Sequence, residues 1–195
     1  KQEMDFSRPY LANQQVIIVK ADSDIADIAS LAGKIVGLQK GSSALDALNK
    51  NEIASQVASV QEYADNVTAL TDLSIGRLDA VVLDEVVARY YETKEAGTYK
   101  VLDEAFAAEE YGIGFKKGNT DLEEKVQKAF DEMIADGTAA KISEKWFGTN
   151  LIVSDRDYPK DQEPASDDTS LEDLKSRGKF VLGLDDSFPP MGFRD

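Results

Sequence analysis

The ten residues from Gly76 to Glu85 constrain the fold more than any other stretch of the chain. A predicted helix ends at Gly76, and a continuous apolar run, Ala80 to Leu83, lies between charged residues. Such a run is typical of a central parallel strand that helices cover on both faces. Asp84 follows the run directly, and ligands of open α/β sheets bind beyond the carboxyl ends of the strands. The stretch therefore predicts a buried strand that carries one carboxylate to a binding edge.

Two roles are open for Asp84. In the first, its carboxylate receives the ammonium group of a small zwitterion. In the second, it caps the helix predicted from Val86 to Tyr91, because Asp is a favoured N-cap residue. The two roles are compatible with each other.

Strand and helix signals alternate through the first half of the chain. Apolar and β-branched runs predict strands at 14–20, 34–38, 57–60, 80–83 and 99–102. Helices are expected between them, at 25–31, at 44–48, after Asp65 and at 86–91. The alternation predicts the α/β class, with a parallel sheet and helices on both sides.

The loop Gln39-Lys40-Gly41-Ser42-Ser43 joins the second predicted strand to a helix that Ser43 would cap, with Asp46 three residues further on. Backbone N–H groups and hydroxyls at a helix N-terminus form an anion site, which suits a carboxylate or a side-chain amide. The loop has neither the phosphate-loop pattern nor the dinucleotide fingerprint. An ordinary βα turn without a ligand accounts for these residues equally well.

Composition excludes several classes of function. The chain has no Cys and no His, which removes disulfides, thiolate zinc sites, cysteine nucleophiles and the usual base of Ser-His-Asp catalysis. The net charge is −15, and no basic stripe is present, so nucleic acid is not expected as a partner. No apolar run approaches the length of a transmembrane helix, and no signal peptide is recognised. We expect no cofactor, no metal and no catalytic residue.

The second half changes character. A helix begins with the capping box Thr120 and Glu123, a second follows Gly137, and its Trp146 is expected to anchor it in a core. Residues 155–169 are polar, contain two prolines and predict a linker. A helix from Ser170 to Arg177 and an apolar strand, Lys179 to Leu184, follow. That strand must join a sheet formed elsewhere or expose an edge.

The segment SLEDLKSRGKFVLGLDDSFPPMGF, from Ser170 to Phe193, resembles the mature start of a bacterial extracellular solute-binding protein of the polar amino-acid family. Five other segments resemble later parts of that family's sequence: Met4–Tyr10, Lys34–Ser43, Gly76–Glu85, Tyr111–Gly118 and Ile142–Gly148. The resemblance covers nearly all of the chain outside the predicted linker. It implies a type II periplasmic-binding-protein-like fold, in which two Rossmann-like lobes joined by two crossing strands close on an amino acid and deliver it to an ABC importer.

The order of these segments differs from the family's order, so the chain resembles a circular permutant that lacks most of the first lobe. An engineered permutant or a fragment would explain this, and a second chain or a swapped copy would complete lobe 1. The implied domains are a crossing segment with part of lobe 1 (1–18), a complete lobe 2 (19–110), the return crossing with C-terminal helices on lobe 1 (111–154), the linker (155–169), and the first helix and strand of lobe 1 (170–195). Lys179–Leu184 is expected to pair in a lobe 1 sheet built partly by another polypeptide.

The resemblance also implies the ligand contacts. Asp84 matches the carboxylate that holds the α-ammonium group, Gln39 would touch the ligand side chain, and Phe188 would pack over the ligand. The remaining contacts that it implies are Gly41, Ser42, Ser43 and Asp185. The implied ligand is a polar or neutral, glutamine-like amino acid. The implied partners are the membrane subunits of an ABC transporter, and the implied location is extracytoplasmic, in the periplasm or, as a lipoprotein, at the cell surface.

Two alternatives stay open. Dehydratases on this same fold use a carboxylate in the cleft as a general acid, a role that Asp84 or Asp185 could fill. A structural fragment that binds nothing is the other alternative, because half of a clamp lacks the contacts of the missing lobe.

Overall fold

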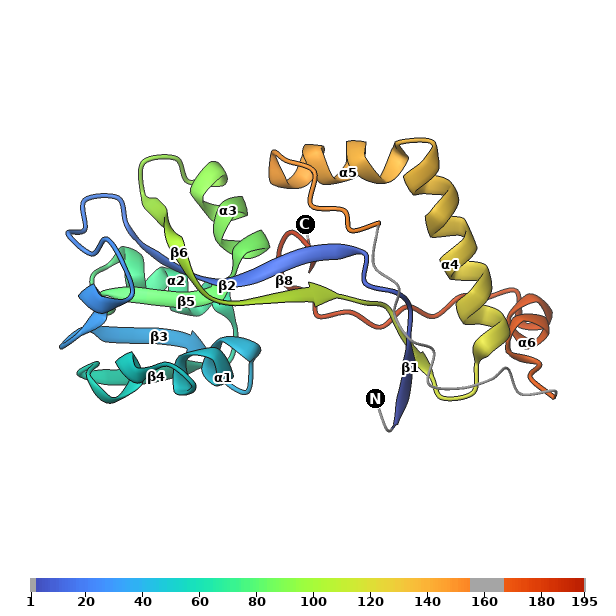
Figure 1. Ribbon diagram of the computed structural model, residues 1–195, viewed down its shortest axis with the longest axis horizontal. Helices are drawn as coiled ribbons and strands as arrows, with labels where there is room; N and C mark the ends of the chain where they lie inside the picture. The colour runs from blue at the N-terminus through green and yellow to red at the C-terminus, as the bar shows by residue number, and fades with distance from the viewer. Residues whose placement is uncertain (1–2, 155–166, 195) are drawn as a thin grey trace. The chain divides into compact units, whose positions relative to one another are not determined.

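The computed structural model describes residues 3–154 and 167–194 (Figure 1). The chain divides into two compact units: unit 1 comprises 1–12 and 110–183, and unit 2 comprises 13–109 and 184–195. Residues 155–166, which make up most of the predicted linker, lie outside the described residues.

Unit 2 is built on a five-stranded sheet with the strand order β4-β3-β5-β2-β6 (Figure 1). Its strands are β2 (Leu11–Lys20), β3 (Ile35–Gln39), β4 (Ser59–Tyr63), β5 (Ala80–Asp84) and β6 (Tyr99–Tyr111). Its helices are α1 (Ser43–Asn49), α2 (Asn66–Ser74) and α3 (Glu85–Lys94), with 3-10 turns η1 (Ala29–Leu31) and η2 (Glu52–Ser55). The predicted α/β class is confirmed.

The sheet is mixed, so the expectation of a wholly parallel sheet was wrong. Strand β3 runs parallel to β4 and β5, but β2 runs antiparallel to β5, with Gln15 opposite Asp84. Hydrophobic patterning identifies strands without giving their direction, which explains the error. Because β2 is reversed, its beginning meets the edge at which β5 ends.

Strand β5 is covered on both faces, as its apolar run predicts. Ala80 and Val82 belong to the apolar cluster that includes Leu48 of α1. Val81 and Leu83, which alternate with them, are also buried. Full burial of a Val or Leu side chain is worth about 1.5–3 kcal/mol, so this run holds β5 in the centre of the sheet.

Strand β6 continues to Tyr111, well beyond the predicted end at Leu102. Residues 103–110 are rich in Ala, Asp and Glu, which strands disfavour when they are judged alone. Pairing with β2 overrides that preference. Ala21 donates its N–H to the carbonyl of Thr98 near one end of the pair, and the Asn13 side chain donates to Glu109 near the other.

Unit 1 contains a small antiparallel pair, β1 (Met4–Phe6) with β7 (Gly114–Lys116). Its helices are α4 (Thr120–Ala135), α5 (Thr138–Phe147) and α6 (Ser170–Arg177). The predicted capping box of α4 was wrong, because the N-cap residue is Asn119 and makes no side-chain capping bond. The Asp168 carboxylate takes that role by accepting from the Asp121 N–H at 2.7 Å and from the Thr120 hydroxyl at 2.9 Å.

The region after α6 differs from expectation. Lys179–Leu184 contains no strand, and its side chains are exposed, with Val181 at 74%. An apolar strand needs a pairing partner, and within the described residues this segment has none. The chain then forms a hairpin of β8 (Ser187–Phe188) and β9 (Gly192–Phe193). Trp146 is 40% exposed, so its expected place in a core was also wrong.

Across 3–154 and 167–194, no helix combines the length and the apolar character that crossing a membrane requires.

Candidate ligand-binding site

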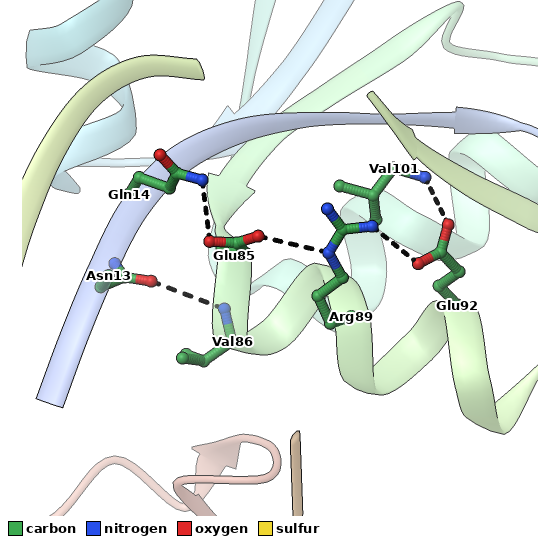
Figure 2. Close-up of polar contacts among 7 residues, drawn as sticks. All are labelled: Asn13, Gln14, Glu85, Val86, Arg89, Glu92 and Val101. Atoms are coloured by element: carbon green, nitrogen blue, oxygen red, sulfur yellow. Dashed lines mark hydrogen bonds and ion pairs between the residues drawn. The ribbon is translucent and has the colours of Figure 1, made fainter. Parts of the chain in front are cut away.

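Asp84 is the last residue of β5 and directly precedes α3. It occupies the N-cap position, yet its side chain makes no capping hydrogen bond. The Asn13 side-chain oxygen accepts from the Val86 N–H instead, at 3.5 Å (Figure 2). Capping is therefore not what the Asp84 carboxylate does.

The Asp84 carboxylate belongs to a group of acceptors around the side-chain nitrogen of Gln15. Three oxygens lie within hydrogen-bonding distance of this nitrogen: Asp84 Oδ1, Glu109 Oε1 at 2.7 Å and Ser43 Oγ at 3.1 Å. We call Ser43, Asp84 and Glu109 the acceptor cluster. Gln15 is fully buried, Asp84 and Glu109 are half-buried, and Ser43 is exposed. The cluster thus combines two carboxylates and a hydroxyl within reach of one nitrogen.

Each member of this arrangement comes from a different element, and the strand directions bring them together. The parallel strands β3 and β5 end at the same edge, which places the β3–α1 connection near Asp84. The reversed β2 brings Gln15 opposite Asp84. The extended β6 then supplies Glu109, which also accepts from the Asn13 amide at 2.6 Å.

Glu85, the neighbour of Asp84, is engaged in a separate network that fastens α3 to β2 and β6 (Figure 2). Its carboxylate accepts from Gln14 at 2.9 Å and pairs with Arg89 at 3.3 Å. Arg89 also pairs with Glu92 at 3.1 Å, and Glu92 accepts from the Val101 N–H at 2.8 Å. The two adjacent carboxylates therefore have different tasks, and Glu85 is structural.

Of the predicted contacts around the β3–α1 connection, Ser43, the first residue of α1, belongs to the acceptor cluster. The N-cap position of α1 is Ser42 rather than Ser43, so the predicted cap was wrong by one residue. The Ser42 hydroxyl donates to the Gln39 carbonyl at 2.7 Å, and Gly41 adopts a positive φ of 68° in the turn. The Gln39 amide donates to the Ala64 carbonyl at 3.2 Å and so is directed toward the loop before α2.

Asp185 and Phe188 lie in and beside the β8–β9 hairpin of unit 2. The Asp185 carboxylate accepts from the Ser187 N–H at 2.8 Å, which stabilises the turn into β8. Phe188 is half-buried on β8, and this strand contacts α2. The hydrogen bond that Asp185 accepts therefore lies within its own hairpin segment.

Gln15 and Glu109 are two site residues that sequence reasoning missed. Gln15 immediately precedes the apolar run from Val16 to Val19, where a polar residue that is itself buried signals a polar function. Glu109 carries no such signal, because it lies within a stretch that is acidic throughout. The described residues contain no group of three or more side chains suited to hold a metal ion.

Together, the mixed sheet and the acceptor cluster define an α/β unit able to bind a cationic group beyond the carboxyl ends of β3 and β5. Comparison with known proteins identifies the family to which this α/β unit belongs. Residues 1–149 match the model of the bacterial extracellular solute-binding proteins, family 3. The chain belongs to this family, as the sequence resemblance predicts.

Individual relatives agree with this assignment. The chain is 37% identical over 153 residues to the L-cystine-binding protein TcyJ of Escherichia coli (strain K12), covering 77% of this chain and 56% of that protein. It is 32% identical over 155 residues to the histidine-binding periplasmic protein of Salmonella typhimurium (strain LT2), covering 75% and 59%. The chain thus spans less than two thirds of these relatives' lengths.

Solved structures show the same fold. An ancestral arginine-binding protein bound to glutamine has a TM-score of 0.66 and 41% identity, covering 76% of this chain and 65% of that one. A Streptococcus pneumoniae substrate-binding protein of an ABC uptake transporter, with bound histidine, has a TM-score of 0.70 and 33% identity, covering 77% and 64%.

Proposed function

We propose that this chain binds a free amino acid outside the cytoplasm, as part of a receptor that delivers the amino acid to an ABC importer. One observation carries the proposal: two carboxylates and a hydroxyl surround a single nitrogen at the carboxyl ends of β3 and β5. Every free amino acid carries an α-ammonium group that such a set of acceptors fits. A hydrogen bond to a charged group of this kind is worth about 1.5–3 kcal/mol.

The relatives support an amino acid as the ligand but differ in its side chain. They include a cystine-binding protein, a histidine-binding protein and an arginine-binding protein with bound glutamine. We therefore propose a polar or neutral, glutamine-like amino acid. The predicted contacts Gln39, Gly41, Ser42, Asp185 and Phe188 stay part of this proposal.

The proposal also covers the chain's role and partners. The ligand is bound and released unchanged, since the family consists of solute-binding proteins. The membrane subunits of an ABC transporter receive it. The permuted order, the domain boundaries and the second chain or swapped copy remain predictions. A completing partner would have to cover the exposed apolar side chains of Phe180 to Leu184.

A thermal-shift screen tests the proposal with the twenty amino acids and cystine. A ligand that binds only the folded chain must raise the melting temperature. The strongest ligand is then measured by calorimetry against Asp84→Ala. We expect a loss of affinity of about 10- to 150-fold, which corresponds to the charged hydrogen bond. Nuclear magnetic resonance spectra of the ligand after incubation should show no product.

The matched control is Asp103→Ala, which removes an exposed carboxylate from the same sheet and leaves the acceptor cluster intact. It should bind like the unaltered chain. If no amino acid raises the melting temperature, the proposed function is wrong. If Asp84→Ala binds as tightly as the control, the assignment of the ammonium group to Asp84 is wrong.

A further inference from the structure

The side-chain nitrogen of Gln15 has more hydrogen-bond acceptors around it than it has hydrogens to donate. A side-chain amide nitrogen carries two hydrogens, yet three acceptors of the cluster lie within its hydrogen-bonding distance: Ser43 Oγ, Asp84 Oδ1 and Glu109 Oε1. The amide therefore cannot donate to all three oxygens at once. A primary ammonium group carries three hydrogens on one nitrogen and would satisfy all three acceptors at once.

The other end of the same amide is a second, independent sign. Gln15 is fully buried, and its Oε1 has no hydrogen-bond partner among the described residues. Buried acceptors are nearly always paired, and a stranded one is unfavourable. Turning the amide over would place this oxygen against two carboxylates, with only the Ser43 hydroxyl able to donate, and that hydroxyl already donates to Glu109. Holding the nitrogen against the cluster thus keeps the carbonyl unsatisfied.

Charge gives a third reason. Two carboxylates share one neutral donor, and this donor brings no positive charge to set against their mutual repulsion. The Glu109 carboxylate accepts hydrogen bonds from three neutral groups, those of Asn13, Gln15 and Ser43. A cation in the position of the amide nitrogen would neutralise one of the two charges and attract both carboxylates.

We propose that the Gln15 amide nitrogen lies at a cation position of the site, and that a primary ammonium group of the ligand takes over its three acceptors. Glu109 is then a second specificity-determining carboxylate beside Asp84. The cluster selects among cations by the number of N–H donors on one nitrogen. The partial exposure of Ser43, Asp84 and Glu109 lets the ammonium group arrive from solvent, while Gln15 lies buried. This inference deepens the proposed function and rests on it for the identity of the natural ligand.

Alkylammonium ions test the inference without any amino acid. Uniformly ¹⁵N-labelled full chain is titrated at constant ionic strength with methylammonium, dimethylammonium, trimethylammonium and tetramethylammonium, which carry three, two, one and no N–H donors. The readout is the side-chain amide signal of Gln15, assigned by its absence in Gln15→Ala. The neighbouring Gln14, whose amide donates to Glu85, serves as the internal control.

We expect methylammonium to move the Gln15 signal away from its bound position, with apparent affinity falling stepwise along the series and no effect from tetramethylammonium. The Gln14 signal should stay in place. Glu109→Gln should lower the apparent affinity for methylammonium at least tenfold. It should also make the affinity depend less on the number of N–H donors of the ion. Glu104→Ala, which removes a carboxylate further along β6, should change neither.

Equal responses to all four ions would mean charge screening and would overturn the inference, as would a Gln15 signal that stays fixed while the backbone of Asp84 responds. The ion series on the unaltered chain decides the matter even if a Glu109 variant fails to fold. The two hypotheses fail separately. If the ions displace Gln15 according to their donor number but no amino acid binds, only the proposed function is wrong. If an amino acid binds and the Gln15 signal does not move, only this inference is wrong.

Discussion

Glu92 offers a direct test of how the site's framework is held together. Its carboxylate does two things: one oxygen accepts from the Val101 N–H at 2.8 Å, and the other pairs with Arg89 at 3.1 Å (Figure 2). Val101 is buried and belongs to β6, the last strand in the sheet order. Its N–H therefore finds its acceptor on α3 rather than on another strand.

Two substitutions separate these tasks. Glu92→Ala leaves the buried N–H of Val101 unpaired, which costs about 1–3 kcal/mol. Glu92→Gln keeps a carbonyl oxygen for Val101 and loses only the half-exposed ion pair with Arg89, which is worth about 0.2–1 kcal/mol. The alanine variant should thus be less stable than the glutamine variant by about 1–2 kcal/mol.

Urea denaturation measures the free energies of unfolding, and hydrogen exchange at the Val101 amide shows where the effect arises. The loss in Glu92→Gln should vanish in high salt, because salt screens exposed ion pairs, while most of the loss in Glu92→Ala should persist. Glu95→Ala, which removes the exposed carboxylate just after α3, is the control and should be nearly neutral. Equal losses in the two Glu92 variants, or unchanged exchange at Val101 in the alanine variant, would refute the reasoning.

Three further predictions concern stability. Leu38→Ala empties a fully buried position in β3 and should lower the free energy of unfolding by about 2–5 kcal/mol in urea titrations. Asp65→Ala removes the cap that accepts from the Thr68 N–H at 2.8 Å, and should cost about 0.5–2 kcal/mol by the same assay. Hydrogen bonds, chiefly from the Asp121 N–H and also from Ser170 and Thr120, lower the pKa of Asp168 from 3.8 to about 2. Because this pKa is depressed by folding, its contribution is present above pH 4 and is lost as the pH falls toward 2; Asp168→Asn should flatten that acid limb of the stability curve.

Local signals gave the right elements where one residue type dictates the backbone. Helix α6 spans Ser170–Arg177 as predicted, because Gly178 takes a positive φ of 59° that ends it. Strand β5 lies where the apolar run Ala80 to Leu83 places it, since burial on both faces leaves no other position for such a run.

The errors arose where long-range pairing decides. The acidic half of β6 is a strand because β2 pairs with it, whereas Lys179–Leu184 has strong strand composition but no strand in the described chain, because no partner lies beside it. Glu109 could not be assigned to the site for the same reason. Glu109 reaches the site only because β6 extends to the edge at which β5 ends, and no local sequence pattern predicts that extension.

The role of Asp84 shows most clearly how strand direction creates the site. Its position before α3 allowed capping or ligand binding, and sequence alone could not choose between them. The antiparallel pairing of β2 with β5 puts Gln15 opposite Asp84 and brings Asn13 to the N–H of Val86. Capping therefore passes to Asn13, and the Asp84 carboxylate joins the acceptor cluster. Since side chains alternate along a strand, a slip of β2 by one residue would turn Gln15 to the opposite face, and the cluster would lose its central donor while every individual strand kept its composition.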